Sequence, residues 1–192
     1  MKRIFLLLAF AGTFAAAKAQ TGYGVKAGLN VTNIGGADAN NNKARVTLHG
    51  GAYADFSVTN KFSIQPELLY SMQGFTYESP SRDVKYRLGY LNIPVMFKYH
   101  VTSPFYIEAG PQFGFLLSAK AKAGSTKVNV KDNYKTFDLG LGLGAGYKFP
   151  RTHLGIDARY NIGLSRLDEN GNAKIYNRVF QVGLFYELGR TR

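Results

Sequence analysis

The fold of this chain is decided by one stretch, Phe137-Asp138-Leu139-Gly140-Leu141-Gly142-Leu143-Gly144-Ala145-Gly146-Tyr147-Lys148-Phe149. Its odd positions are all apolar, and its even positions are Gly, Asp or Lys. Because successive side chains of a β-strand point to opposite faces, the pattern predicts a strand with one apolar face and one small or polar face. Beyond residue 20 no run of about 18 apolar residues occurs, so no membrane-spanning helix is expected there.

The same alternation recurs in further segments of the chain. In 105–118, for example, it sets Phe113 and Leu117 against Glu108, Gln112 and Ser118. Each segment is long enough to cross a bilayer as a tilted strand, which takes about 9 to 11 residues. With the glycine-rich stretch, these segments make eight predicted strands; the other seven cover 23–31, 45–58, 62–77, 87–100, 105–118, 153–167 and 176–188.

The links between these strands alternate in length. Tight turns are expected near Thr59, near Thr102 and at 150–152. Long loops on one rim and short periplasmic turns on the other are typical of outer-membrane β-barrels. The long, polar links are 33–44, 78–86, 119–134 and 168–175.

Alternation alone fits a soluble β-barrel or sandwich, with its apolar face inward, as well as a membrane barrel with that face toward lipid. Two features favour the membrane barrel. Charges of both signs lie mid-strand on the polar face, where they can pair across a narrow lumen. Aromatic residues gather near strand ends on the apolar face, as an interfacial girdle requires: Tyr99, Phe105, Tyr147, Phe149 and Tyr186. The predicted fold is therefore all-β, an eight-stranded antiparallel up-and-down transmembrane β-barrel.

The N-terminus has the features of a secretory signal. Lys2 and Arg3 form a positive start, an apolar run follows, and Ala17-Lys18-Ala19 supplies an A-x-A cleavage site. The alternative, a membrane helix, needs a longer apolar run than this one. We therefore expect a cleaved signal peptide at 1–19, a barrel domain at 20–192, and export to the outer membrane of a Gram-negative cell.

The polar face offers a candidate site in the lumen. Glu67 and Glu108 form an acid/base pair in one interpretation, but Lys and Arg residues are equally available as their partners. We therefore predict a structural charge network in the lumen. Its expected members are Lys26, Glu67, Lys98, Glu108, Asp157, Arg159 and Glu187.

Composition excludes several kinds of chemistry. The chain has no cysteine, which rules out disulfides, zinc–thiolate sites and cysteine nucleophiles. Its three histidines lie in different strands without metal-ligand spacing, and the alternating glycines do not match the G-x-G-x-x-G phosphate loop. A glycine rail that leaves room for larger side chains in the lumen is the favoured interpretation. No catalytic residue, cofactor or metal is predicted.

The chain is basic, with a formal net charge of +12. Nucleic acid is not the expected partner, because the Lys and Arg residues are scattered and the protein is predicted to be exported. The link at 119–134 contains Lys120, Lys122, Lys127 and Lys131. It is either a solvated basic loop or a contact for lipopolysaccharide phosphates and outer-membrane lipids.

The assembled strands resemble the PorT-like outer-membrane β-barrel family of the Bacteroidota. The resemblance covers nearly all of the chain after the leader and is most specific in Tyr23–Asn30, Gln65–Tyr70, Tyr90–Tyr99 and Gly110–Ser118. It implies an eight-stranded outer-membrane barrel and brings no catalytic residue with it.

The last predicted strand resembles the recognition signal of the barrel-assembly machinery. The corresponding residues are Gln181, Gly183, Tyr186 and Leu188. The chain departs from the strictest form of this signal, because it lacks a terminal Phe and continues to Arg192. An ordinary edge strand is the alternative.

The sequence thus predicts a small, non-enzymatic outer-membrane barrel with a structural or loop-mediated binding role. Two alternatives stay open at this point. One is a narrow channel for small solutes or a secreted ligand-binding barrel, and the other is a lipid-modifying barrel enzyme, which needs a Ser-His or similar constellation.

Overall fold

The computed structural model of the chain describes residues 21–37, 39, 42–78, 83–169 and 174–191. The predicted signal peptide at 1–19 lies outside these residues. Eight strands form the body of the molecule: β1 (Thr21–Gly35), β3 (Arg45–Ser57), β4 (Phe62–Gln73), β6 (Val84–His100), β7 (Phe105–Ala123), β9 (Phe137–Lys148), β10 (Leu154–Gly163) and β11 (Tyr176–Thr191).

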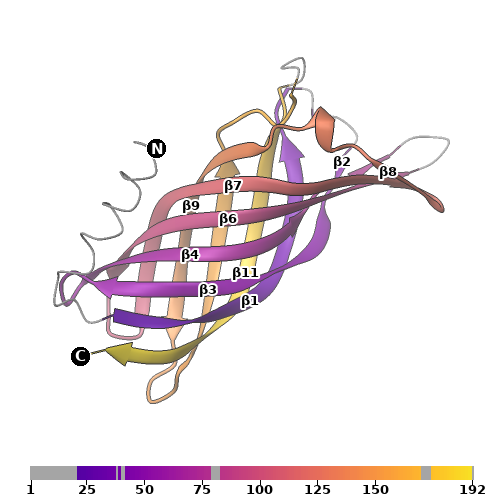
Figure 1. Cartoon of the computed structure of the whole chain (residues 1–192). Helices are drawn as coiled ribbons and strands as arrows, with labels where there is room; N and C mark the ends of the chain where they lie inside the picture. Colours follow the sequence, from indigo (N-terminus) through magenta and orange to yellow (C-terminus); the bar gives the residue numbers. More distant parts are fainter. Residues whose placement is uncertain (1–20, 38, 40–41, 79–82, 170–173, 192) are drawn as a thin grey trace, which may run out of the picture.

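These eight strands close into an antiparallel ring in the order β1-β3-β4-β6-β7-β9-β10-β11 (Figure 1). Each ring strand pairs with its neighbours along the chain, and the ring closes where the first strand pairs with the last. That closing pair runs from Thr21 opposite Thr191 to Gly35 opposite Tyr176. The up-and-down barrel predicted from alternation is the observed architecture of the ring.

Three further short strands lie outside the ring, so the fold is not a plain eight-stranded barrel. They are β2 (Asn42–Lys43), β5 (Thr76–Tyr77) and β8 (Thr126–Asn129), and a single 3-10 turn spans Lys131–Asn133 in the described part of the chain. β2 pairs with β5, β5 with β6, and β8 with β7, which extends one side of the barrel beyond the ring (Figure 1).

The link 119–134 is therefore not the loop that the sequence predicts. β7 continues to Ala123 and turns through Gly124, which has a φ of +59° that favours glycine, into β8. Ala119-Lys120-Ala121-Lys122-Ala123 keeps the period of two, but its small and charged residues lack the β-branched and aromatic side chains typical of strands. Pairing with β6 holds this segment in a strand despite its composition.

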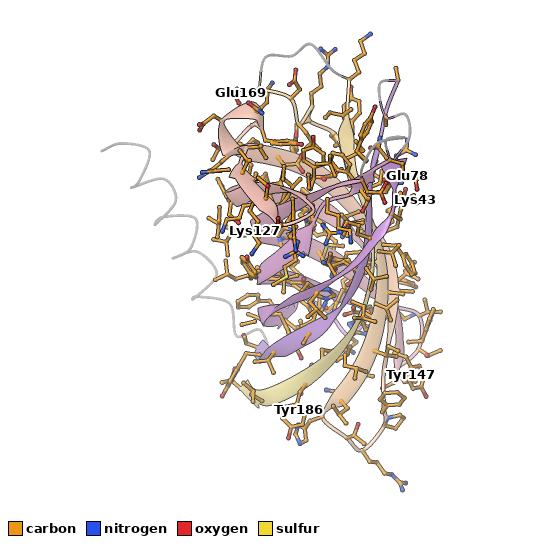
Figure 2. All side chains as sticks on the ribbon, turned by 90° about the vertical axis from the view of Figure 1, so that its right-hand side faces the viewer. Lys43, Glu78, Lys127, Tyr147, Glu169 and Tyr186 are labelled. Carbon is orange, nitrogen blue, oxygen red and sulfur yellow. The ribbon has the colours of Figure 1, made fainter. Side chains whose placement is uncertain are left out.

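The barrel is apolar outside and largely polar inside. Outward side chains such as Leu29, Leu143 and Leu184 are about half exposed, whereas the mid-strand charged residues are buried. Figure 2 shows Tyr147 and Tyr186 near the short-turn end, far from Glu169 at the other end. This is the inverse of a soluble barrel, and it suits a lipid environment. None of the helical turns in the described residues is long and apolar enough to cross a membrane.

At the end with the long links, apolar side chains fill the interior. Eight buried side chains pack together there, and Tyr86, Val130 and Ile175 pack against them. Burial raises the pKa of Tyr134, which therefore stays a neutral phenol. We call this cluster the apolar cap: Ile34, Phe75, Leu88, Tyr90, Leu116, Ala119, Tyr134 and Leu167.

Candidate functional site

A layer of charged side chains crosses the middle of the lumen. The Arg159 guanidinium donates to both oxygens of Glu67, at 3.0 and 2.8 Å, and its Nε donates to Glu108 Oε1 at 2.8 Å. All three side chains are at most 2% exposed. A planar guanidinium that binds two carboxylates in this way fixes the relative positions of three strands.

Lys26 completes this layer from a fourth strand. Its ammonium lies 2.9 Å from Glu67 Oε1 and 2.6 Å from Asp157 Oδ2. We call Lys26, Glu67, Glu108, Asp157 and Arg159 the charged layer. Its members come from β1, β4, β7 and β10, which are every second strand of the ring. A narrow barrel is commonly filled in such layers.

The glycines of β9 make room for these side chains. A Cβ on Gly142 would lie 3.2 Å from Cδ of Arg159, and one on Gly144 would lie 3.1 Å from Oε1 of Glu108. A Cβ on Gly146 would come within 2.3 Å of the Tyr106 ring. The predicted role of the glycine rail is therefore confirmed.

Two of the residues predicted for the lumen network lie apart from the charged layer. Lys98 reaches it only through Gln65, which accepts from the Lys98 ammonium and donates to Glu67 at 2.6 Å. Glu187 lies nearer the short turns, where its Oε2 is 2.8 Å from the Lys148 ammonium and 3.4 Å from Nη2 of Arg190.

Between the charged layer and the apolar cap, amide side chains fill the lumen. Asn30 Oδ1 accepts from Gln181 at 2.9 Å and lies 2.7 Å from Nδ1 of His49, and Gln181 accepts from Asn161 at 2.7 Å. Because Asn30 Oδ1 can only accept, Nδ1 is the protonated nitrogen of His49. Gln181 and Gly183 of the predicted assembly signal thus face the lumen, while Tyr186 and Leu188 are exposed on the outer face of β11.

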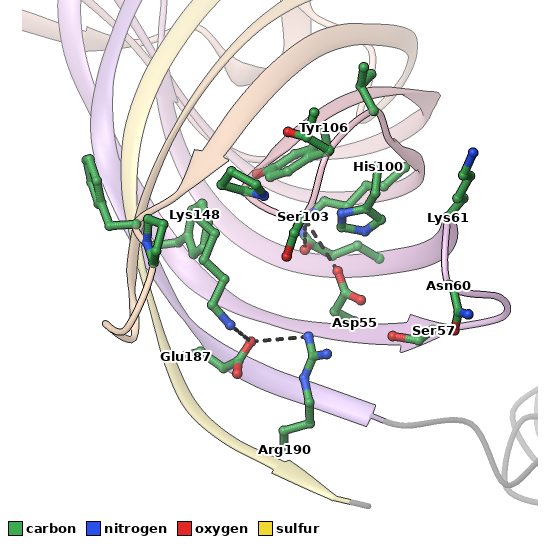
Figure 3. A pocket seen from close by; sticks show the side chains of 18 of the residues that line it. Asp55, Ser57, Asn60, Lys61, His100, Ser103, Tyr106, Lys148, Glu187 and Arg190 are labelled. Carbon is green, nitrogen blue, oxygen red and sulfur yellow. Dashed lines mark hydrogen bonds and ion pairs between the residues drawn. The ribbon is translucent and has the colours of Figure 1, made fainter.

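At the short-turn end the lumen opens into a cup of about 900 Å³ (Figure 3). Its wall includes the buried rings of Tyr53, Tyr106 and Phe185, and Lys98 lies 4.1 Å above the Tyr106 ring. Lys148, Glu187 and Arg190 point toward one another on one side, and Asp55 lies across from them (Figure 3). The sequence pattern did not reveal this cup, because its lining comes from the ends of several strands and from all three short turns.

Behind the lining of the cup, a buried serine lies beside a histidine. Ser63 Oγ lies 3.3 Å from Nε2 of His100 and donates to Asp55 Oδ2 at 3.3 Å. A nucleophilic serine needs its proton directed to the histidine, and the carboxylate must orient the far side of that ring. Here the carboxylate contacts the serine itself, and Ser63 is 2% exposed, so this arrangement does not form a catalytic triad.

A third feature is a set of cations on the outer side of the barrel extension. Lys85 pairs with Lys122, Arg87 with Lys120, and Lys122 with Lys127 across adjacent strands. Directly opposite residues in antiparallel strands share a face, so all five side chains lie on one side. Tyr86, between two of them, packs on the apolar cap from the other side. We call Lys85, Arg87, Lys120, Lys122 and Lys127 the basic face; Lys127 is labelled in Figure 2.

A β-bulge turns this basic face outward. Gly89 pairs with Ser118 and Tyr90 with Leu116, which leaves Leu117 as an extra residue in β7. One extra residue reverses the sides of all that follow. Ser118, predicted on the lumen side, therefore faces outward, and a Cβ on Gly89 would meet both its hydroxyl and that of the exposed Tyr70.

Comparison with protein families identifies the family to which this barrel belongs. Residues 16–169 match the outer membrane protein beta-barrel domain family. The chain belongs to this family. The match covers most of the barrel and indicates an outer-membrane location, whereas a search of curated proteins gives no match.

Solved structures support the same fold at low sequence identity. Neisserial surface protein A (NspA) has a TM-score of 0.57 at 14% identity, covering 86% of this chain and 97% of its own. Ail, the attachment invasion locus protein of Yersinia pestis, has a TM-score of 0.53 at 14% identity, covering 90% of this chain and all of its own. A second Ail structure, in complex with the heparin analogue sucrose octasulfate, has a TM-score of 0.52 at 13% identity and covers 88% and 99%. This outer membrane protein beta-barrel domain thus shares its fold with small outer-membrane barrels.

Proposed function

We propose that this protein is a non-catalytic outer-membrane barrel that binds the phosphate groups of lipopolysaccharide through its basic face. The observation that carries the proposal is the alignment of like charges. Lys85, Lys122 and Lys127 lie directly opposite one another on three adjacent strands. Like charges in this position repel and destabilise the pairing, and a bound anion removes that cost.

The position of the basic face suits the outer leaflet. Exposed apolar side chains, among them Phe115 and Leu117, precede it on the outer side of β7. Four of its five residues are exposed, and Lys122 is half-buried. A cation near an anionic membrane surface contributes about 1 kcal/mol to binding. A shallow hollow of about 300 Å³, lined by Lys85, Arg87, Lys122, Asp83 and Gly124, offers a concave place for a phosphate group.

The Ail structure with sucrose octasulfate supports a polyanion as the ligand. That protein, whose fold is similar, was solved in complex with the heparin analogue sucrose octasulfate, a sulfated sugar. The phosphorylated sugars of lipopolysaccharide present the same chemistry, closely spaced anions on a sugar. Outer-membrane lipids around the barrel are the natural source of such groups.

The finer details of origin and biogenesis belong to the same proposal. The PorT-like family of the Bacteroidota is the proposed subgroup, on the segments Tyr23–Asn30 and Tyr90–Tyr99. We propose that a signal peptide at 1–19 is cleaved during export. The barrel-assembly machinery would then recognise β11, whose lumenal Gln181 and outward Tyr186 lie on opposite faces.

Ligand-induced stabilisation tests the proposal. The protein is placed in zwitterionic nanodiscs, and its melting temperature is measured by heat-modifiable gel migration with added lipopolysaccharide or its dephosphorylated form. Binding to the folded state alone raises the melting temperature. We expect a rise with lipopolysaccharide only, and its loss in Lys120→Gln/Lys122→Gln. The matched control Lys61→Gln/Arg151→Gln removes two charges at the short-turn end of the barrel. In this control, lipopolysaccharide should still raise the melting temperature. Equal stabilisation by both lipids would contradict the proposal.

A small-solute channel is the second candidate, because the cup gives water access to one end of the lumen. The charged layer, the amide side chains and the apolar cap fill the lumen beyond it. We therefore expect no steady conductance in planar bilayers, and a clear steady current would favour the channel.

A lipid-modifying enzyme is the third candidate. Its only structural support in the described residues is the contact between Ser63 and His100, and the Ser63 proton is directed to Asp55. Unchanged lipid A after overexpression is the expected result.

A further inference from the structure

We infer that the cup at the short-turn end is a binding site for a small organic anion with one apolar end, such as an aryl phosphate or carboxylate. This inference does not depend on the basic face, which lies at the opposite end of the barrel. It rests on the charges, the aromatic wall and the size of the cup.

The cup has an excess of positive charge. Five cationic side chains line it (Lys61, Lys98, Lys148, Arg151 and Arg190), against the carboxylates of Asp55 and Glu187. Among the described residues, Lys61 and Arg151 have no ion-pair partner. Lys98 is already held by Gln65 and Asp55, the latter at 3.4 Å. The lining thus attracts an anion from the periplasmic side.

Two of these cations are placed to receive it. Lys148 and Arg190 share a single carboxylate oxygen of Glu187, at 2.8 and 3.4 Å. Their side chains stay 33% and 40% exposed, while the Glu187 side chain is 10% exposed. Lys148 has three donors and Arg190 has five, so most of them remain available to another acceptor. A phosphate or carboxylate can bind both cations without displacing Glu187.

An apolar surface lies directly beside these cations. The rings of Tyr53 and Phe185 meet edge to face with centroids 6.0 Å apart, and Tyr106 completes the wall. Each of these three residues is at most 7% exposed, so close packing on their other sides holds the rings in place. A ring or short alkyl group of a ligand would pack against it, since aromatic walls favour flat apolar groups.

The size of the cup fits such a ligand. Binding pockets for small molecules are commonly about 300 to 1,000 Å³, with apolar walls and a few placed polar groups. The cup, at about 900 Å³, falls in this range. The other end of the lumen has no comparable opening in the described residues, because the apolar cap fills it. Because only the short-turn end is open in the described residues, a small ligand that enters the lumen would bind at that end.

The test uses 4-fluorophenyl phosphate as the probe and the full barrel in phosphatidylcholine nanodiscs. Binding is measured from the broadening of the probe's fluorine resonance, with empty nanodiscs as the blank. We expect Lys148→Gln/Arg190→Gln to weaken binding at least about tenfold, because hydrogen bonds to two charged donors are lost. The matched control is Lys120→Gln/Lys122→Gln, which removes two charges from the basic face and should leave binding unchanged.

Three outcomes would overturn the inference. They are no broadening above empty nanodiscs, equal weakening by the two double variants, and displacement of the probe by inorganic phosphate at the same concentration as by phenyl phosphate. The last would show that the aromatic wall contributes nothing. Heat-modifiable migration verifies that each variant is folded, and the single change Arg190→Gln, at a 40% exposed side chain, provides a milder variant.

Discussion

The charged layer and the apolar cap fill the same lumen with opposite chemistry. Both are buried, since Arg159 and Glu67 are at most 3% exposed and Leu88 and Leu116 are 1% exposed. In the charged layer every contact is directional and joins named atoms on different strands. In the apolar cap the side chains are held by shape and by exclusion of water, as in the core of a soluble protein.

This difference teaches what each region contributes. A buried ion network adds little net stability over an apolar filling, but it penalises any arrangement that leaves a charge unpaired. The charged layer therefore favours one stagger of the strands, because only that stagger brings Lys26, Glu67 and Arg159 together. The apolar cap tolerates variation in pairing and contributes through the area it buries.

The largest expected effect comes from breaking the charged layer at its centre. Arg159→Met leaves the carboxylates of Glu67 and Glu108 short of a partner, with only Lys26 to balance three acids. We expect a loss of about 3 to 5 kcal/mol in the free energy of unfolding. Urea unfolding in phospholipid vesicles, followed by circular dichroism, measures it. Adding Glu108→Gln to Arg159→Met should recover part of the loss, and no recovery would argue against the pairing described here.

A smaller effect is expected in the apolar cap. Leu116→Ala removes a 1% exposed side chain and leaves a cavity, which should cost about 2 to 4 kcal/mol. The same unfolding measurement applies, and the effect should not change with salt. The control Leu184→Ala, on the outer face at 57% exposure, should cost less. A greater loss for Leu184→Ala would contradict the assignment of the two faces.

Gly146→Ala tests the space that the glycine rail provides. The new Cβ would lie 2.3 Å from the Tyr106 ring, so the ring must shift, at a cost of about 1 to 3 kcal/mol. Gly50→Ala is the matched control, because its nearest neighbour would be 3.5 Å away. Unfolding free energies of the two variants decide the point: equal values would show that the rail is not tightly packed.

The smallest effect is expected outside the ring. Glu78 accepts from Lys43 between β2 and β5 (Figure 2), and this contact raises the pKa of the Lys43 ammonium. The pKa of Lys43 is therefore higher in the folded state than in the unfolded state. Any stabilisation from this contact is fully present at a pH below the pKa of the unfolded state, and it is lost as the pH rises through the pKa of the folded state. Because the pair is exposed, Glu78→Gln should leave the unfolding free energy at neutral pH unchanged. A clear loss would mean that β2 and β5 support the ring.

Much of the ring was predictable from the sequence. The period-two pattern identified each of its strands, because a lipid-facing side chain must alternate with a lumenal one. The glycine positions of β9 also indicated where large side chains would lie. Both inferences use only local order along one strand.

The remaining features depend on how strands are placed against one another. Glu67 and Arg159 are 92 residues apart, and no local pattern shows that they meet while Glu187 pairs elsewhere. Four of the five residues of the basic face, all except Arg87, were predicted to lie in loops. In β7 the reason is that the Ala and Lys residues of 119–123 are not typical of strands. The bulge at Leu117 reversed the side on which Ser118 lies. The sequence did not predict this reversal, because one unpaired residue leaves no mark on the alternating pattern. The cup is lined by the ends of several strands and by three turns. The alternating pattern within a strand does not show how these parts lie relative to one another.

The pairing of the first strand with the last affects the order in which the barrel forms its contacts during folding. The Thr191 hydroxyl donates to the carbonyl of Thr21 across 170 residues of chain, so closure joins the two ends of the barrel. Contacts of such long range form slowly, because loop closure must precede them. Until the 16 residues of β11 arrive, β1 and β10 each present an open edge that can pair with another chain. Pairing of β11 with β1 and β10 therefore determines when the folding barrel stops being prone to aggregation.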